Sequence, residues 1–387
     1  KQLHIVNYDS KDEDSEISIN MAFGREDNST TLRKDWLGGY IKDNTLDYTS
    51  KTVTIKEFVD LDLIHFSNSD NIRSIASVID GLKPSQRKVI YSCMKRNLKS
   101  EIRVAQLAGY VSEIAAYHHG EASLQGTIVN MAQTFVGSNN INLLEPLGQF
   151  GTRLSGGKDA AQARYIHTMM AQNTDTIFDK RDNPLLKYCD DDGLLIEPVY
   201  YVPTIPMLLV NGSSGIGTGW MTDIPSFNPT DIIANIKRHL NGESMLEMIP
   251  YYAGFKGSIV QAKDKSDIPI DKTYKSRGLY TISGDKLDIR ELPVGVWTDT
   301  YKEHLEKLSA DKKNIRYYNS YCTDVDVHFE LFLGESLIST YDKSREKFEK
   351  TMKLNSTISC RNLVAFNSEN KLVKYDNVLE MLEEYIG

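Results

Sequence analysis

The sequence is poor in cysteine and shows none of the spacings through which cysteine serves metal or redox chemistry. The four cysteines are Cys93, Cys189, Cys322 and Cys360. They lie far apart, without the short pairs that bind zinc or cycle between thiol and disulfide. This pattern excludes a disulfide-stapled scaffold and favours a reducing compartment, with no metal site expected in this chain.

The chain also lacks a hydrophobic run long enough to cross a bilayer. One of its most apolar stretches, residues 202–210, is interrupted by Pro203 and Pro206. A spanning helix needs about 20 consecutive apolar residues. We therefore expect no membrane partner.

A glycine-rich segment over residues 212–219 lacks the lysine of a nucleotide-binding loop. No Gly-Lys-Ser/Thr follows its glycines, so a phosphate-cradling P-loop is excluded. Two interpretations remain for Ile216, which has a glycine on each side. It is either an exposed apolar wedge that enters between base pairs, or a core residue in a tight turn.

Charge is distributed unevenly along the sequence. The net charge of -8, taken as a whole, argues against a nucleic-acid-binding chain. Residues 71–110, however, carry 8 Lys and Arg against 2 Asp and Glu, a local charge of +6. Such a basic island attracts a phosphate backbone, although a solvated helix face would explain the same charges. The acidic residues 9–16 predict a mobile loop.

Apolar spacing predicts consecutive helices between residues 84 and 135. Pro84 suits the first turn of one helix, and a second is expected over residues 104–116. A third opens near Glu121, with an apolar stripe that reaches Phe135. The short joint at residues 117–120 makes the last two a candidate helix-turn-helix.

Short strands become frequent after residue 250. Gly284-Asp285 predicts a two-residue hairpin turn between strands over 280–283 and 286–289. Helices are expected over residues 230–240 and 300–308. The fold class predicted is therefore α+β and multidomain, with a helix-turn-helix region followed by a mixed α/β region.

Several side chains between residues 73 and 119 are candidates for phosphate binding. A turn at residue 80 leads into a helix N-terminus, whose free N–H groups and dipole favour anions. The basic residues around this turn are Arg73, Lys83, Arg87 and Lys88. His119 could donate a hydrogen bond to a phosphate, or simply be a polar residue in a turn. Its neighbour His118 does not form a chelating pair with it, because adjacent histidines point in different directions on a helix.

Arg164-Tyr165 is the candidate catalytic pair. A tyrosine hydroxyl is a weak nucleophile at neutral pH, because its ordinary pKa is about 10. An adjacent guanidinium can hold a phosphate and favour the phenolate. Tyrosine is also among the side chains that form covalent intermediates. A glycine-rich approach carrying Lys158 precedes the pair. By contrast, Asp190-Asp191-Asp192-Gly193 lacks the alternate spacing of metal ligands and is interpreted as a solvated loop.

These segments occur in an order that is typical of one family. The matching stretches are Asp70–Ile75, Gly81–Lys88, Val104–Ala108, Tyr117–Glu121, Phe135–Asn140, Gln149–Arg153, Gly156–Ala160, Ala163–Ile166 and Gly215–Trp220. Together they resemble the breakage-reunion region of eukaryotic-type DNA topoisomerase II, over most of residues 50–300.

The resemblance implies a domain order. Residues 1–59 are expected to be the end of a Toprim region and a linker. Residues 60–205 would form a winged-helix domain, 206–365 a tower domain, and 366–387 the start of a coiled-coil connection. The chain is expected to be a fragment, lacking the ATPase domain and most of the metal-binding Toprim domain.

The resemblance also implies residue roles. Tyr165 would attack a DNA phosphorus and form a 5′-phosphotyrosyl link. Arg164 would stabilise the pentavalent phosphorus, and His119 would hydrogen-bond an oxygen of the phosphate. Ile216 would be the intercalating wedge. The remaining expected DNA contacts are Arg73, Lys83, Arg87, Lys88 and Lys158.

The implied partners are double-stranded DNA and a second gate protomer in a homodimer, and the implied compartment is the nucleus. Mg²⁺ and ATP are expected to bind domains outside this chain. Two departures from the family pattern, at Val199-Tyr200 and Ser213-Ser214, lie near the wedge. The alternative function is a non-catalytic helix-turn-helix DNA-binding scaffold.

Overall fold

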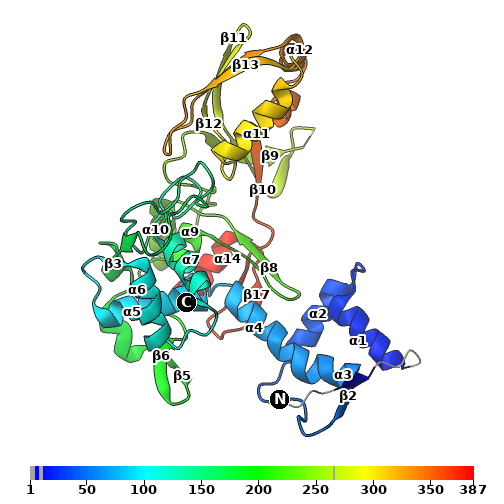
Figure 1. The fold of residues 1–387 in the computed structure, drawn as a ribbon, viewed down its shortest axis with the longest axis vertical. Coiled ribbons are helices and arrows are strands. Elements are labelled where there is room, and N and C mark those ends of the chain that lie inside the picture. The colour runs from blue at the N-terminus through cyan, green and yellow to red at the C-terminus, as the bar shows by residue number, and fades with distance from the viewer. Residues whose placement is uncertain (1–4, 8–11, 265) are drawn as a thin grey trace.

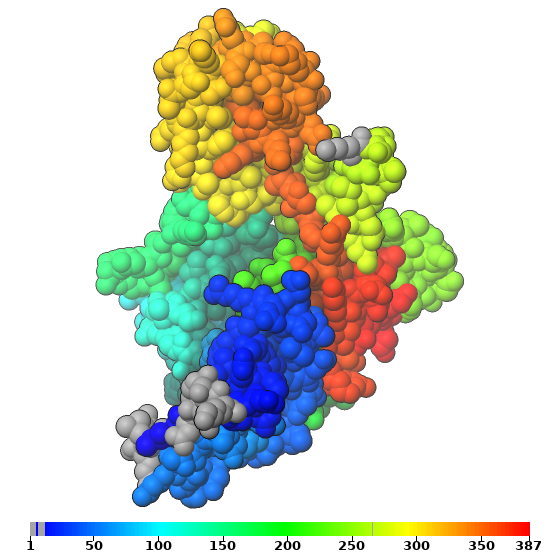
Figure 2. Space-filling model, turned by 90° about the vertical axis from the view of Figure 1, so that its right-hand side faces the viewer, coloured from blue at the N-terminus to red at the C-terminus, as the bar shows by residue number. Residues whose placement is uncertain are grey.

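The computed structural model describes residues 5–7, 12–264 and 266–387. Figure 1 shows an elongated molecule, in which a helical N-terminal segment and a strand-rich segment extend from a central body. In Figure 2 the N-terminal segment forms a separate lobe low on the visible face, and the strand-rich segment forms the top. We call these parts the N-terminal module, the main core and the distal core.

The N-terminal module consists of short helices beside one parallel strand pair. Its elements are β1 (Ile5–Asn7), α1 (Glu13–Phe23), α2 (Ser29–Gly38), β2 (Thr52–Thr54), α3 (Ile55–Phe58), a π-helical turn (Val59–Leu63) and α4 (Ile64–Ser74). Side chains satisfy the helix ends. Thr54 and Glu57 form a capping box at α3, and Arg33 donates to carbonyl groups at the end of α1.

The prediction of a mobile loop over residues 9–16 is wrong for residues 13–16, which are helical. Residues 8–11 lie outside the described residues. Helix α1 begins at Glu13, and the Asp12 side chain accepts from the Asp14 N–H as its N-cap. The acidic residues of the first turn favour this helix because they face its positive dipole end. The sequence prediction overlooked this capping role.

The main core contains the predicted consecutive helices. They are α5 (Pro84–Arg96), α6 (Val104–Ile114) and α7 (Glu121–Ala132). Helix α5 begins with Pro84 and ends at Asn97, which has a positive φ of 52°. The apolar stripe of α7 is buried as expected, although Phe135 lies beyond the end of the helix.

Later parts of the chain return to the main core. Its other elements are β3 (Ile102–Arg103), β4 (His167–Thr168), α8 (Thr174–Ile177), a 3-10 helix (Lys180–Leu185), β5 (Tyr188–Asp191), β6 (Leu194–Pro198), α9 (Met207–Asn211), β7 (Ser213–Ile216), β8 (Met221–Ile224), α10 (Pro229–Leu240), β16 (Val364–Phe366), β17 (Leu372–Lys374) and α14 (Val378–Ile386). Phe227, Leu363 and Met381 are buried in the same cluster as the helices α5 to α7. The buried side chains are therefore not divided at residue 206, where the resemblance places a domain boundary.

The distal core combines two sheets with three helices. One sheet has the order β15-β10-β9, from Asn355–Ser359, Pro269–Arg277 and Ser258–Lys263. The other has the order β11-β12-β14-β13, from Leu279–Ser283, Lys286–Glu291, Phe329–Leu333 and Ile315–Ser320. The helices are α11 (Thr298–Ser309), α12 (Glu335–Lys343) and α13 (Arg345–Thr351). The predicted hairpin is confirmed, because β11 and β12 pair around Gly284, whose φ is 62°. The predicted α+β architecture is confirmed as well.

A buried ion pair joins the two cores. Arg153, in a loop of the main core, donates to both carboxylate oxygens of Glu291 at the end of β12. Both side chains are almost fully buried. The Glu291 carboxylate also accepts from the backbone N–H groups of Lys256 and Leu292. With its hydrogen bonds satisfied in this way, the pair fixes the loop of the main core to the distal sheet.

Among the described residues, no helix is both long enough and apolar enough to cross a membrane.

Candidate functional site

Tyr165 lies on an exposed turn that is held firmly on both sides. The preceding Ala163 carbonyl accepts from Ala105, and the following Ile166 carbonyl accepts from Val104, both at the start of α6. Ile166 is buried, whereas 66% of Tyr165 is exposed. The local fold therefore anchors the backbone and presents the phenol to solvent, as a nucleophile for a large substrate requires.

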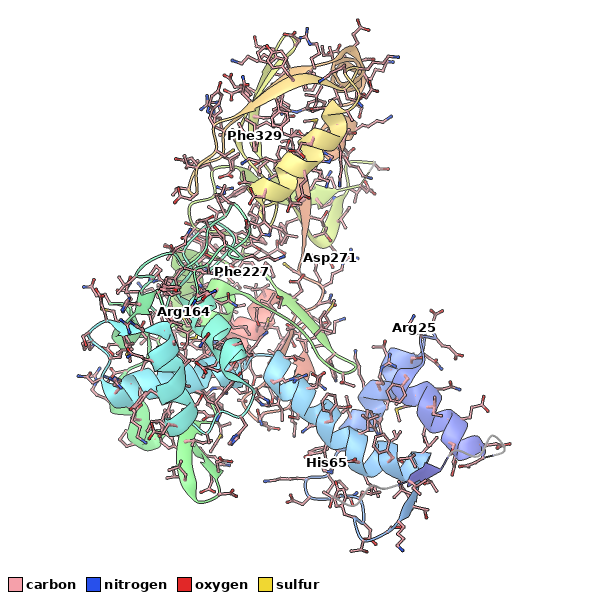
Figure 3. The ribbon with its side chains drawn as sticks, viewed as in Figure 1. Arg25, His65, Arg164, Phe227, Asp271 and Phe329 are labelled. Atoms are coloured by element: carbon pink, nitrogen blue, oxygen red, sulfur yellow. The ribbon has the colours of Figure 1, made fainter. Side chains whose placement is uncertain are left out.

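Arg164 lies beside the tyrosine. Its guanidinium carbon is 4.8 Å from the centre of the Tyr165 ring, which is a cation–π distance. Figure 3 places Arg164 on the main core, away from Phe329 of the distal core. The sequence prediction of an adjacent cation and phenol is thus matched by their spatial proximity.

The glycine-rich approach to Tyr165 folds into a closed loop. Thr152 donates its backbone N–H and its hydroxyl to the two carboxylate oxygens of Asp159, at 2.9 and 2.6 Å. Burial acts to raise the pKa of Asp159, but the hydrogen bonds from Thr152 outweigh it and hold the pKa below its usual value. Lys158, next to this carboxylate, is exposed at the loop surface. It remains available for a phosphate.

A second group of predicted residues lines one cavity of about 520 Å³. Arg73, Lys83, Lys88, His119 and Ile216 all contribute to its wall. The cavity lies where α4 ends, α5 begins and α7 begins. Tyr165 and Arg164 do not line it in this chain. The structure therefore brings most of the predicted phosphate-binding residues together.

His119 and Lys83 have different environments within this cavity. His119 is exposed in the joint before α7, with its ring 5.6 Å from that of Tyr117 in an edge-on contact. Lys83 is half-buried and donates from Nζ to the Ser214 carbonyl at 2.7 Å. Burial lowers the pKa of Lys83, because it disfavours the charged ammonium. An incoming phosphate would relieve this cost.

Arg87, which the sequence predicts to contact DNA, is turned inward in this structure. Its buried guanidinium donates to both oxygens of Asp80 and to the Leu82 carbonyl. The reason is helical geometry, because Arg87 shares the inward face of α5 with Ile90 and Met94. A guanidinium in that position needs an internal carboxylate, and Asp80 supplies it.

Lys88 is also paired inside the protein. Its Nζ donates to Glu197 at 2.9 Å and to the Ala115 carbonyl at 2.5 Å. Lys88 reaches the cavity wall, but its charge is balanced by a buried carboxylate. Arg87 and Lys88 are therefore not among the proposed direct phosphate contacts. The spacing of charges in the sequence could not distinguish these residues from Lys83.

Ile216 is exposed, so the alternative that placed it in the core is wrong. It lies at the end of β7, paired with Met221 of β8, and 78% of it is exposed. The side chain is therefore accessible to a partner. Sequence reasoning missed the residues that hold this hairpin in place, because they come from the N-terminal module.

The aspartate run is not a solvated loop but part of a hairpin. Strands β5 and β6 flank Asp192 and Gly193, whose φ angles are 51° and 86°. Two positive φ values suit a type I′ turn, for which Asp-Gly is a preferred pair. The signal was present in the sequence and was overlooked. Asp191 lies 3.6 Å from Nε2 of His118.

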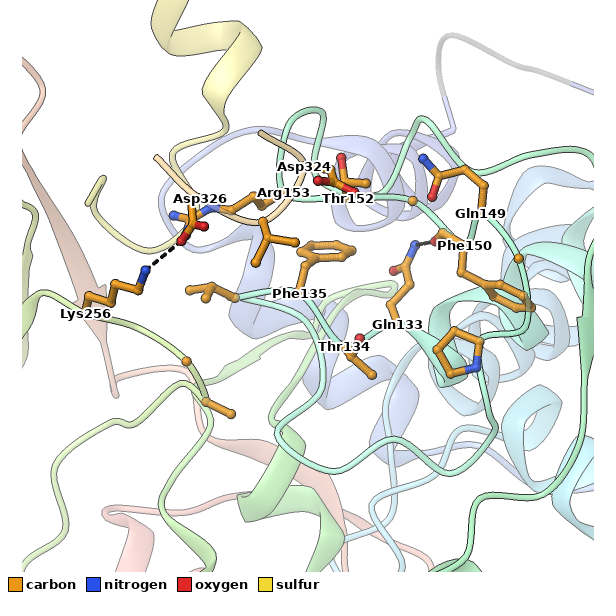
Figure 4. A pocket seen from close by; sticks show the side chains of 17 residues that line it. Gln133, Thr134, Phe135, Gln149, Phe150, Thr152, Arg153, Lys256, Asp324 and Asp326 are labelled. Atoms are coloured by element: carbon orange, nitrogen blue, oxygen red, sulfur yellow. Dashed lines mark hydrogen bonds and ion pairs between the residues drawn. The ribbon is translucent and has the colours of Figure 1, made fainter. Parts of the chain in front are cut away.

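A different cavity, of about 450 Å³, lies between the main and distal cores (Figure 4). Phe135, Phe150 and Arg153 line it from the main core. Lys256 and Asp326 form a 2.7 Å ion pair at its edge. Because both of these side chains are more than half exposed, the ion pair contributes little to stability.

Comparisons with known proteins identify the family. Residues 73–387 match the family model that describes the A subunits of DNA gyrase and topoisomerase IV. Residues 1–71 match the C-terminal associated domain of TOPRIM. The chain belongs to this DNA gyrase/topoisomerase IV family, within its eukaryotic-type topoisomerase II branch.

Individual relatives agree with this assignment. Over 95% of this chain, the sequence is 49% identical to DNA topoisomerase 2 of Bombyx mori. Over the same share, it is 46% identical to DNA topoisomerase 2 of Plasmodium falciparum. It spans about a quarter of these relatives, 24% and 26% of their lengths. A crystal structure of the Plasmodium falciparum topoisomerase II DNA-binding, cleavage and re-ligation domain superposes with a TM-score of 0.86. That match covers 97% of this chain and 50% of the other, at 44% identity.

Proposed function

We propose that this chain is the DNA-gate portion of an ATP-dependent type II DNA topoisomerase. The single observation that carries the proposal is the exposed Tyr165, stacked against Arg164 on a rigidly anchored turn. The similarity of the chain to the cleavage domain of topoisomerase II supports the proposal. A non-catalytic scaffold would not require an exposed phenol beside a guanidinium.

In the proposed reaction, the phenolic oxygen of Tyr165 attacks a backbone phosphorus of the DNA. The new bond joins this oxygen to phosphorus, and the bond from phosphorus to the 3′ oxygen breaks. The phenol gives up its proton and the departing 3′ oxygen gains one. Arg164 stabilises the extra negative charge on the pentavalent phosphorus. His119 donates a hydrogen bond to a phosphate oxygen.

The 5′-phosphotyrosyl link retains an activated phosphodiester, so religation is the reverse reaction. The 3′ hydroxyl attacks the phosphorus and Tyr165 leaves. Cleavage of both strands by two copies would open a gate for a second duplex, which is why we propose a homodimer. The DNA backbone would be held by Arg73, Lys83 and Lys158, whose side chains reach the surface. Arg73 is ion-paired to Asp70 at 2.6 Å, but unlike Lys88 it remains more than half exposed and can also face a phosphate.

We propose the domain order that the family resemblance suggests, with the end of the Toprim region at 1–59, a winged-helix domain at 60–205, a tower at 206–365 and a connection at 366–387. In this division the buried main core continues across residue 206. The eukaryotic relatives support a nuclear location. The described part of the chain offers no recognisable donor set for Mg²⁺ and no phosphate-cradling loop for ATP. It contains no group of three His, Cys, Asp or Glu side chains that could hold an ion, and its glycine-rich segment is a β-hairpin. We propose that other domains of the enzyme bind both.

The proposed nucleophile can be identified directly. The full-length protein is incubated with a short duplex, denatured with detergent and digested with trypsin. We expect the nucleotide adduct on the tryptic peptide that ends at Lys180 and contains Tyr165. An adduct on a different tyrosine would overturn the assignment.

The chain by itself is expected to bind duplex DNA without relaxing supercoiled plasmid, even with Mg²⁺ and ATP present. The reason is that its described residues form neither a metal cluster nor a nucleotide loop. Plasmid relaxation on agarose gels measures this, with the full-length protein as the positive control. Steady relaxation by the chain alone would show that it contains the missing sites.

Replacement of Ile216 by alanine is expected to reduce DNA bending and leave stability almost unchanged. An exposed side chain contributes under about 0.5 kcal/mol, which corresponds to a melting temperature within about 2 °C of the wild type. Insertion between base pairs offsets a few kcal/mol of unstacking, so its loss favours straight DNA. Energy transfer across a labelled duplex reports the bend.

Leu185→Ala is the matched control for Ile216→Ala. Leu185 is 86% exposed and lines a different cavity from the one that Ile216 lines. The Leu185→Ala variant should show the wild-type DNA bend and the wild-type melting temperature. Normal bending by Ile216→Ala would exclude a wedge.

A further inference from the structure

The tip of the β7–β8 hairpin lies directly against the N-terminal module. A Cβ atom at Gly215 would lie 2.0 Å from the Ser74 carbonyl oxygen, and one at Gly217 would lie 2.1 Å from Oδ1 of Asn71. Both neighbours belong to α4. The glycines beside Ile216 are therefore required for close approach to α4, and they do more than leave the isoleucine uncovered.

Polar contacts continue along the tip. Asn71 donates from Nδ2 to the Thr218 carbonyl, and the Thr218 hydroxyl donates to Asp70, both at 3.1 Å. The ammonium of Lys34, on α2, lies 4.3 Å from the centre of the Trp220 ring. Two helices of the N-terminal module thus bind consecutive parts of the tip.

The base of the hairpin belongs to the main core. The Thr222 hydroxyl donates to the Val364 carbonyl, and the Asp223 N–H donates to the Asn362 carbonyl. Within the tip, Trp220 packs against a small cluster that contains Ile75. The hairpin therefore bridges two parts of the molecule, and its exposed Ile216 lies at the end that the N-terminal module holds.

We infer that the N-terminal module positions Ile216, with Asp70, Asn71 and Lys34 as the positioning residues that act through Thr218 and Trp220. The inference rests on the proposed function of Ile216 as a wedge. The orientation of α4 sets the direction in which the isoleucine enters DNA. Because coupling between two sites is reciprocal, a DNA that seats the wedge also fixes the N-terminal module. Bending thus orients the part of the chain that matches the C-terminal associated domain of TOPRIM.

Thr218 offers a matched pair of variants for the test. Thr218→Val removes the hydroxyl and keeps the shape, while Thr218→Ser keeps the hydroxyl. At saturating full-length protein, Thr218→Val should lower the ratio of bent to straight duplex about 2- to 10-fold, as the loss of one hydrogen bond implies. Thr218→Ser should bend DNA like the wild type. Thermal melting of each variant verifies that it is folded.

Lys34 provides a second pair on a different helix. Lys34→Met removes the charge over Trp220 and should reduce bending, whereas Lys34→Arg retains a cation and should not. As an independent readout, amide exchange over residues 70–74 should slow on binding of bendable DNA. It should slow less when Ile216 is alanine.

The outcomes separate the inference from the proposed function. Reduced bending with Ile216→Ala but normal bending with both Thr218→Val and Lys34→Met would overturn the positioning role and leave the wedge intact. If the Ile216→Ala variant bends DNA normally, Ile216 is not a wedge. The positioning role, which depends on the wedge, is then overturned as well. Equal losses for Thr218→Val and Thr218→Ser would show that the hydroxyl is not responsible, which also contradicts the inference.

Discussion

Full-length protein with phenylalanine at position 165 should bind duplex DNA normally and lose DNA cleavage. The change Tyr165→Phe removes one oxygen from a side chain that is 66% exposed, so neither folding nor the basic surface is disturbed. Removal of a covalent nucleophile lowers turnover by at least about a thousandfold. Detergent trapping of protein–DNA adducts measures cleavage, and gel shifts on the same preparation measure binding.

The control for this experiment is Tyr321→Phe. Tyr321 is also exposed, at 54%, and lies after β13 in the distal core. The Tyr321→Phe variant also loses one phenolic oxygen, but it should form protein–DNA adducts at the wild-type level. Adducts that persist in Tyr165→Phe at that level would eliminate Tyr165 as the nucleophile, whatever the control shows.

The second large effect is expected at the ion pair between the two cores. Arg153→Met should lower the free energy of unfolding by about 3–5 kcal/mol, because it leaves the Glu291 carboxylate buried without its counter-ion. Urea unfolding followed by tyrosine and tryptophan fluorescence measures this loss. The double variant Arg153→Met with Glu291→Leu should be less destabilised than Arg153→Met alone, because no uncompensated charge remains.

Lys256→Met serves as the matched control for Arg153→Met. Its ion pair with Asp326 lies at the edge of the neighbouring cavity, but both side chains are more than half exposed. An exposed pair contributes about 0–1 kcal/mol, so the unfolding curve should hardly move. A loss for Arg153→Met no larger than that of the control would mean that the buried pair does not hold the cores together.

The sequence by itself determined the local structure of the main core and the identity of the chemical groups. Pro84, the apolar stripe of α7 and the Gly284 turn each specify their element through short-range geometry. The ordered motifs around Arg164-Tyr165 were sufficient to identify the family. These features depend on neighbouring residues in the chain, so a linear pattern contains them.

Only the tertiary structure decided which charges are free and which are already paired. Arg87 and Lys83 look equivalent in sequence, yet Arg87 meets Asp80 inside the protein and Lys83 reaches the cavity. The glycines on either side of Ile216 carry no sign of a distant partner in the sequence, but they permit contact with α4, which lies about 140 residues earlier in the chain. Burial and long-range packing set the cost of a charge and the space for a Cβ atom, and neither quantity can be read from local spacing.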